Sequence, residues 1–162
     1  MPPTAPVIDI EVEVDTAAWT QSLPGAAAAA REAALAAARL AGSGTIAILL
    51  TDDATVRDLN ARFLCKDAAT NVLAFPAGPN PGNHLGDIAL AFGVCAREAA
   101  EQAKPLADHL RHLVIHGVLH LMGYDHQSED QAEAMERLER DLLAALGVPD
   151  PYAEGDHAQP RR

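Results

Sequence analysis

The chain has 162 residues, of which 49% are hydrophobic and 4% aromatic, so it is long enough for one buried core and too short for two ordinary domains. A net charge of −11 excludes a generally basic nucleic-acid-binding protein, and any RNA binding would need a local basic patch. No apolar run reaches the 18 or more residues of a membrane span, and two widely separated cysteines fit a protein of the reducing cytoplasm.

The first half of the chain predicts two strands, each followed by a helix. Residues 7–14 alternate apolar and acidic side chains, as a half-buried strand does. An Ala-rich helix is expected to open at Pro24, and Trp19 is expected to pack beneath it. Residues 45–50 are mostly apolar and predict a second strand, after which Asp52 can cap the next helix.

The second half predicts two more strands and then three helices. The strands are expected at residues 71–75 and 85–92, on either side of a loop rich in Pro and Gly. A helix over residues 94–104 follows. Pro105 then restarts the chain as a helix that is apolar nearly all round except for a line of histidines, so it should lie across the sheet at the centre of the core.

The last helix and the tail complete the predicted fold. Ser128 and Gln131 form a capping box for a helix that ends near Gly147. We expect a single domain over residues 1–148 and a flexible tail over residues 149–162. This order of elements indicates an α+β fold: a small mixed four-stranded sheet packed by about five helices, with the histidine-bearing helix at its centre.

Three histidines in the run HGVLHLMGYDH have the spacing of a metal site. Helix residues four apart are offset by about 40° and stacked by about 6 Å, so His116 and His120 can point at one ion. Gly123 can adopt a left-handed conformation that ends the helix and returns the chain, so that His126 supplies a third nitrogen. Three protein ligands leave a fourth position of Zn²⁺ open, which favours catalysis over a structural role. Zinc is the expected metal, although three imidazoles also suit Ni²⁺, Cu²⁺ or Co²⁺.

Gly117 separates this run from the metallopeptidases. The motif H-E-x-x-H-x-x-G-x-x-H matches at the three histidines and at Gly123, but its second position is a Glu that serves as general base. Here that position is Gly117, which disfavours peptide hydrolysis. Phosphodiester chemistry depends chiefly on positioning and charge stabilisation, and a ribose can supply its own 2′-hydroxyl.

Three segments together resemble the YbeY family of bacterial endoribonucleases. His112 to His126 reads HLVIHGVLHLMGYDH, which is similar to the metal signature of that family. KDAATNVLAFP at residues 66–76 and LGDIAL at residues 85–90 are similar to two further family elements, in the same order. The resemblance covers about residues 45 to 145.

The resemblance implies a one-metal endoribonuclease that cuts single-stranded RNA, matures the 3′ end of 16S ribosomal RNA and acts with the small ribosomal subunit in ribosome quality control. His116, His120 and His126 become the metal ligands. Leu64 stands where the family usually has an Arg facing the metal, so Arg57, Arg62 or Lys66 is expected to supply the catalytic positive charge. The candidates for a wider basic patch are Arg57, Arg62, Lys66, Arg97 and Arg111. A ribosome-associated assembly factor with a mainly structural metal, and less readily a metallopeptidase, are the alternatives.

Several other polar residues have two readings. Asp125 and Asp87 are the expected partners for the second ring nitrogen of a metal-bound histidine, although Asp125 could instead cap a turn. His112 could pass a proton or sit in the core with its hydrogen bonds satisfied, and His84 could reach the cleft or belong to a loop. Cys65 is expected to be a small buried residue.

Overall fold

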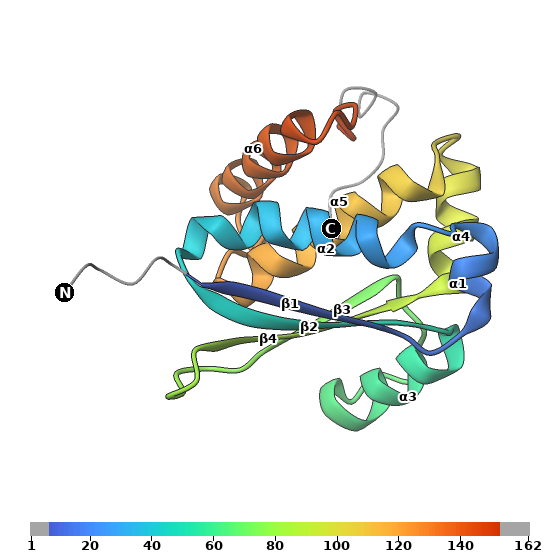
Figure 1. The fold of residues 1–162 in the computed structure, drawn as a ribbon, viewed down its shortest axis with the longest axis horizontal. Helices are drawn as coiled ribbons and strands as arrows, with labels where there is room; N and C mark the ends of the chain where they lie inside the picture. Colours follow the sequence, from blue (N-terminus) through green and yellow to red (C-terminus); the bar gives the residue numbers. More distant parts are fainter. Residues whose placement is uncertain (1–6, 153–162) are drawn as a thin grey trace.

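A mixed four-stranded sheet has helices on both of its faces (Figure 1). The computed structural model describes residues 7–152. The strands are β1 (Ile8–Val14), β2 (Gly44–Thr51), β3 (Val72–Pro76) and β4 (His84–Ala91). Their order is β1-β2-β4-β3; β1, β2 and β4 run parallel, and β3 pairs antiparallel with β4. This confirms the predicted α+β fold with a small mixed sheet.

The helices form unequal layers on the two faces of the sheet. They are α1 (Ala17–Ser22), α2 (Ala26–Ala38), α3 (Asp53–Leu64), α4 (Phe92–Glu101), α5 (Leu106–Leu121) and α6 (Glu129–Ala145), with a short 3₁₀ turn at Arg39–Ala41. Helices α2 and α5 cover one face, α6 lies outside them, and α3 lies on the opposite face (Figure 1). The sequence predicted all of these helices except α1, whose six residues are too short to show a helical period.

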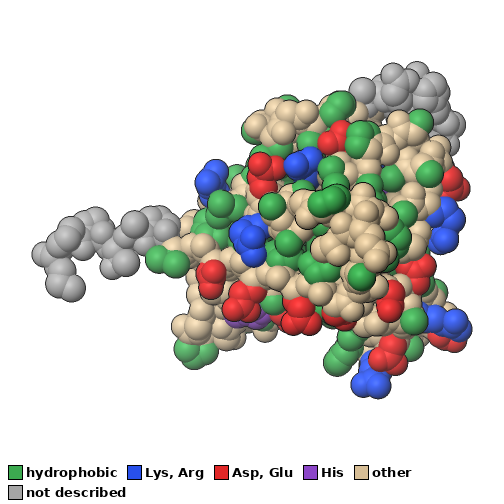
Figure 2. All heavy atoms as spheres, turned by 45° about the vertical axis from the view of Figure 1, so that its right-hand side comes forward, with side chains coloured by type: hydrophobic (Ala, Val, Ile, Leu, Met, Phe, Trp, Pro, Cys, Tyr) green, Lys and Arg blue, Asp and Glu red, His purple; other side chains and the backbone are tan. Residues whose placement is uncertain are grey.

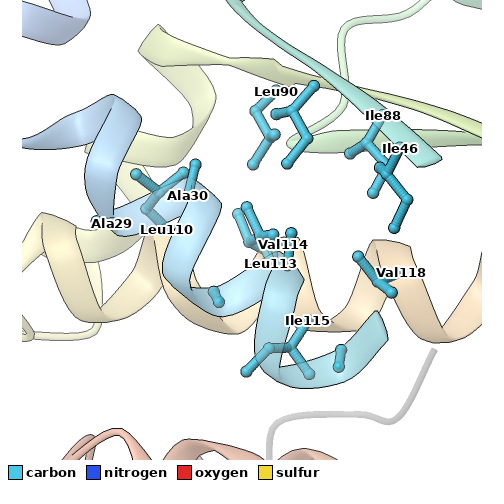
Figure 3. Close-up of a cluster of buried hydrophobic side chains, with 14 of the residues drawn as sticks. Ala29, Ala30, Ile46, Ile88, Leu90, Leu110, Leu113, Val114, Ile115 and Val118 are labelled. Carbon is cyan, nitrogen blue, oxygen red and sulfur yellow. The ribbon is translucent and has the colours of Figure 1, made fainter. Parts of the chain in front are cut away.

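The histidine-bearing helix α5 lies at the centre of the core, as predicted. Its Val114 and Val118 point toward the sheet, and Leu110 lies beside the alanines of α2 (Figure 3). Seven alanines of α2 are buried, which lets that helix approach α5 closely. Trp19 is fully buried in the same cluster, and its Nε1–H donates to the carbonyl of Thr51 at 3.0 Å.

The ends of three helices test the predicted caps. The Asp52 side chain accepts a hydrogen bond from the Thr55 amide at 2.8 Å, as an N-cap should. Ser128 caps α6 through the Gln131 amide at 3.2 Å. The expectation that Pro24 opens α2 is wrong, because the helix begins at Ala26 with Gly25 as its N-cap.

After α6 the described chain continues through a turn to Tyr152. Residues 153–162, on which most of the predicted flexible tail falls, lie outside the described residues. Within residues 7–152, no helix combines the length and the apolar character needed to cross a lipid bilayer.

Candidate metal centre

The C-terminal part of α5 and the loop after it bring the three predicted histidines together. One ring nitrogen from each of His116, His120 and His126 lies within 4.8 Å of those of the other two. Nε2 of His116 and Nε2 of His120 are 3.2 Å apart, and all three residues are half-buried. The site therefore lies at the rim of the core, where a bound ion could be reached from solvent.

The chain reverses after α5 because of Gly123. Its φ of +98° lies in the left-handed region, and its amide donates to the carbonyl of His120 at 3.0 Å. The Asp125 carboxylate then accepts the His126 amide at 2.7 Å, which stabilises the following turn. As a result the ring of His126 stacks on that of His116, with centroids 5.7 Å apart and an interplanar angle of 26°.

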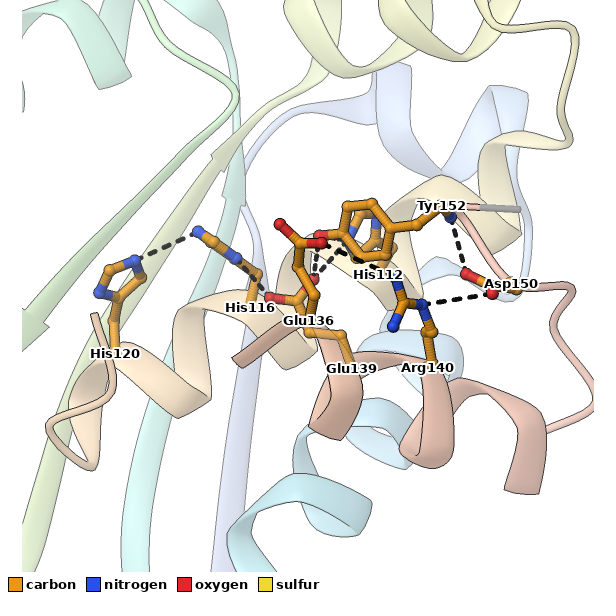
Figure 4. A network of polar contacts seen from close by, with 8 residues as sticks. All are labelled: His112, His116, His120, Glu136, Glu139, Arg140, Asp150 and Tyr152. Atoms are coloured by element: carbon orange, nitrogen blue, oxygen red, sulfur yellow. Dashed lines mark hydrogen bonds and ion pairs between the residues drawn. The ribbon is translucent and has the colours of Figure 1, made fainter. Parts of the chain in front are cut away.

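Glu139 of α6 orients His116, a role that the sequence reasoning did not assign to it. Its Oε2 accepts a hydrogen bond from Nδ1 of His116 at 2.8 Å (Figure 4). Since Nδ1 donates to a carboxylate, Nε2 of His116 carries the free lone pair and faces His120. The other carboxylate oxygen, Oε1, accepts from Nε2 of His112 at 2.7 Å and from the Tyr152 hydroxyl at 2.5 Å.

The electrostatics of the cluster favour an ionised Glu139 and neutral rings at His112 and His120. Burial acts to raise the pKa of Glu139, but the hydrogen bonds from His112 and His116 outweigh it, so the pKa is lowered. Burial lowers the pKa of His112 and, together with the neighbouring rings of His116 and His126, that of His120. Neutral imidazoles are the form that binds a metal.

Gly117 packs against the sheet and cannot be replaced by a catalytic base. A Cβ built on Gly117 would lie 3.1 Å from Cδ1 of Ile88 on β4. A carboxylate at this position would therefore point into the core and away from the histidine cluster. The geometry supports the sequence argument against a peptidase of the H-E-x-x-H type.

The structure corrects the prediction for Asp87 and decides between the two readings of Asp125. Asp87 lies on the sheet face opposite α5, because its neighbour Ile88 faces Gly117 and side chains alternate along a strand. Asp87 pairs instead with His84 at 3.1 Å, and Nδ1 of His84 lies 2.7 Å from the hydroxyl of Thr45. Asp125 accepts the backbone amide of His126, which is the turn-capping alternative.

His112 has the predicted role of a core histidine. Its side chain is 14% exposed and is hydrogen-bonded to Glu139. Its Nδ1 is buried without a partner among the described residues, which a neutral ring tolerates because that nitrogen then carries no proton.

The three predicted basic residues lie on or just after α3, on the opposite face of the sheet from α5 (Figure 1). Arg57 pairs with Asp67 at 2.6 Å, and Arg62 pairs with Asp58 at 3.0 Å. Lys66 is exposed and forms no ion pair with any of residues 7–152. No hydrogen bond or ion pair between described residues joins these three side chains to the histidine cluster.

The end of α3 exposes two further residues of interest. Leu64, where the family resemblance leads one to expect Arg, is 45% exposed. Cys65 is also exposed, so the expectation that it is buried is wrong. Cys65 is the left-handed C-cap of α3, with φ of +58°, and so it lies beyond the apolar face of the helix.

An acidic groove of about 900 Å³ runs along the α3 face of the sheet. Small and apolar side chains such as Ala47, Leu49 and Phe63 line most of it, and its charged lining consists of Glu11, Glu13, Asp87 and Arg31. Acidic side chains also form a row along the lower half of the face drawn in Figure 2. Their charge would repel phosphates, so this groove is a poor site for RNA.

The residues present fit a transition-metal ion. Three imidazoles converge within 4.8 Å, and the Glu139 hydrogen bond directs the free nitrogen of His116 toward His120. Nitrogen ligands at this spacing suit zinc, and a set of three leaves one position open. Such a site can stabilise developing negative charge on a bound substrate.

Comparisons with known proteins agree with this chemistry. The profile of the family Endoribonuclease YbeY matches residues 9–147. The Endoribonuclease YbeY of Maricaulis maris is 53% identical over 152 residues, which cover 92% of this chain and 93% of the relative. That of Paramagnetospirillum magneticum is 48% identical over 159 residues, covering 91% and 97%. A solution structure of a Thermotoga maritima protein shares the fold, with a TM-score of 0.55, 21% identity and coverage of 95% of this chain and 100% of that one. The chain belongs to the YbeY endoribonuclease family.

Proposed function

We propose that this protein is a metal-dependent endoribonuclease that cuts single-stranded RNA during ribosomal RNA maturation, at the 3′ end of 16S RNA, and in ribosome quality control. The observation that carries the proposal is the convergence of His116, His120 and His126 at an accessible rim, in a chain of this family. Ribosomal RNA and the small ribosomal subunit are the proposed partners, and the cytoplasm is the proposed location.

His116, His120 and His126 would hold the metal, for which we propose Zn²⁺. When bound, Zn²⁺ supplies a Lewis acid that stabilises charge on a phosphate. Glu139 holds the ring of His116 in the orientation that presents Nε2. Because Gly117 offers no side chain, any proton acceptor must come from the RNA, from solvent or from another element of the protein.

Of the three basic candidates, we favour Lys66 for contacting the RNA. Because it lies on the far face of the sheet from the histidines, the phosphate that it holds is not the one at the metal. Lys66 is exposed and without an ion pair among residues 7–152, so it can bind an anion without first losing an ion pair. Arg57 and Arg62 remain candidates, because exposed ion pairs are worth only about 0–1 kcal/mol and can be exchanged for a phosphate. Leu64 cannot take this role.

The test combines metal analysis with an RNA cleavage assay. The native protein should contain about one zinc per chain and cleave single-stranded RNA in a chelator-sensitive way. His120→Ala should lose bound metal and cleavage together. Cleavage that persists in the metal-free variant would show that the three histidines do not carry the reaction.

Lys66 is tested separately by salt dependence. Lys66→Ala should weaken RNA binding and reduce the slope of log affinity against log salt concentration by about 0.7, the value for one phosphate contact on a single strand. Arg137→Ala is a matched control, because this exposed residue lies on α6 and is not among the candidates for the basic patch. An unchanged slope in Lys66→Ala would remove Lys66 from the proposal.

A ribosome-associated assembly factor is the second candidate function. The observation that favours it is Leu64, an exposed apolar side chain where the resemblance leads one to expect a positive charge. A native, metal-loaded protein that binds small ribosomal subunits but leaves single-stranded RNA intact would establish this alternative. Peptide hydrolysis is disfavoured because position 117 faces the core.

A further inference from the structure

The segment that follows α6 folds back onto the hydrogen-bond network that Glu139 forms with His112 and His116, beside the metal centre. The Asp150 side chain accepts the Tyr152 amide at 2.7 Å, which makes a local turn. Arg140 of α6 reaches the Asp150 carboxylate at 3.3 Å, and its guanidinium lies over the Tyr152 ring, 5.4 Å from the centroid. We call residues Asp150 to Tyr152 the C-terminal latch (Figure 4).

The last residue of the latch, Tyr152, contacts Glu139, whose carboxylate orients the proposed metal ligand His116. The hydroxyl of Tyr152 donates to Oε1 of Glu139 at 2.5 Å, and the Tyr152 ring meets the ring of His112 edge-on, with centroids 5.5 Å apart. Glu139 is 1% exposed, so water can do little to replace a lost donor. Its other oxygen, Oε2, holds Nδ1 of His116 at 2.8 Å.

We propose that Tyr152 is a positioning residue of the metal centre, which acts through Glu139 on His116 and thereby sets the affinity of the site for its metal. Two donors, Tyr152 and His112, hold Oε1, and this fixes the plane of the carboxylate. That plane determines where Oε2 lies and so where the His116 ring points. Carboxylates that orient metal-binding histidines typically change metal affinity by about 10- to 100-fold when they are mutated.

Tyr152 lies in a segment that the sequence patterns place outside the domain expected over residues 1–148. The hydrogen bond that Tyr152 donates to Glu139 spans 13 residues, and the one that His116 donates to Glu139 spans 23 residues. Three separate parts of the chain, α5, α6 and the latch, therefore meet at one carboxylate. The inference rests on the proposed function only in taking the three histidines as the metal ligands.

The experiment measures metal binding without any RNA. Zinc affinity is determined by competition with a chelating dye, and the visible spectrum of the Co²⁺-loaded protein reports ligand geometry. Tyr152→Phe keeps the ring and removes only the hydroxyl, so it should weaken zinc binding by about 5- to 10-fold and alter the Co²⁺ spectrum. Glu139→Gln should weaken zinc binding by about 10- to 100-fold.

The matched control is Tyr124→Phe. Tyr124 is the other described tyrosine, is 37% exposed, and its hydroxyl makes no hydrogen bond within residues 7–152. Zinc affinity and the Co²⁺ spectrum should match those of the native protein. The midpoint of urea unfolding of each metal-free variant is measured alongside, so that a general loss of stability is recognised.

The outcomes distinguish a failure of the role proposed for Tyr152 from a failure of the proposed metal site. Native affinity and a native Co²⁺ spectrum in Tyr152→Phe would overturn the role of the latch and leave the proposed nuclease untouched. Metal binding retained by His120→Ala would instead overturn the metal site itself. Weaker zinc binding in Tyr152→Phe with an unchanged unfolding midpoint supports the latch, whether or not the protein cleaves RNA.

Discussion

Gly117 shows how a single residue separates two kinds of metal chemistry. Its Cα approaches Ile88 so closely that an added Cβ would lie 3.1 Å from Cδ1 and 3.3 Å from Cγ2 of that side chain. The position is therefore part of the contact between α5 and β4. Restoring the Glu of the peptidase motif at this position would introduce a charge into the core and would not create a general base.

The change Gly117→Glu should destabilise the protein by at least about 3 kcal/mol, because it overpacks the interface and buries a carboxylate. It should confer no peptide hydrolysis. Gly117→Ala is the control, and it should change stability by less than about 1.5 kcal/mol, since a gain in helix propensity offsets a tight contact. Urea denaturation measures both variants. A Glu variant as stable as the Ala variant would show that position 117 does not face the sheet.

At the scale of the element, helix α2 has only small alanine side chains on most of its buried face. Its alanines at 29 and 30 lie beside α5, and both are at most 6% exposed (Figure 3). Small side chains let the two helices approach closely, so α5 stays in place between α2 and the sheet. The rigidity of α5 in turn fixes His116 and His120.

Enlarging this contact should loosen the packing of α5. Ala30→Leu adds three carbons at a fully buried position and should cost about 1–3 kcal/mol through overpacking. Ala28→Leu places the same side chain on the exposed face of α2 and should be nearly neutral. Thermal unfolding of both variants measures the difference. Equal stability would contradict a close α2 to α5 contact.

The elements with a clear period were predictable from the sequence, and the contacts between distant elements were not. The three histidines follow from local spacing, because α5 and the turn at Gly123 act within eleven residues. The sequence does contain a signal for Glu139: it falls on the buried face of α6 with Met135 and Leu143, and a buried acid needs a partner. The partner of Glu139 depends on how α6 packs on α5, and a local sequence pattern does not specify the packing of two helices.

Asp87 shows the same limit on a strand. Its sequence neighbourhood suggested a carboxylate near the metal, but the alternation of side chains puts Asp87 and Ile88 on opposite faces. Choosing the correct face requires knowing that α5, and not α3, covers the side of Ile88. Likewise, α3 and the basic residues at its end lie on the far face from the histidines, which the order of elements alone does not reveal.

At the scale of the whole molecule, metal binding and folding should be coupled. One buried cluster joins α2, α5, α6 and the inner face of the sheet, and the proposed ligands sit at the end of α5. A metal that binds only the folded protein stabilises it by about 2.7 kcal/mol when the free metal is 100 times its dissociation constant. The free energy of unfolding should therefore rise by this amount on adding zinc, and the increase should vanish in His120→Ala.

The fluorescence of Trp19 can measure the effect of zinc on the free energy of unfolding. The same experiment tests whether residues 1–148 form a single domain. Trp19 is the only tryptophan of the chain and is fully buried, so its fluorescence reports on the packing of α1 against the sheet. Far-UV circular dichroism reports mainly on the helices, including α5 and α6. In one cooperative domain the two signals change at the same urea concentration, with and without zinc. A Trp19 transition that precedes the loss of helix would contradict a single domain, and a zinc increment that survives in His120→Ala would place the metal at another site.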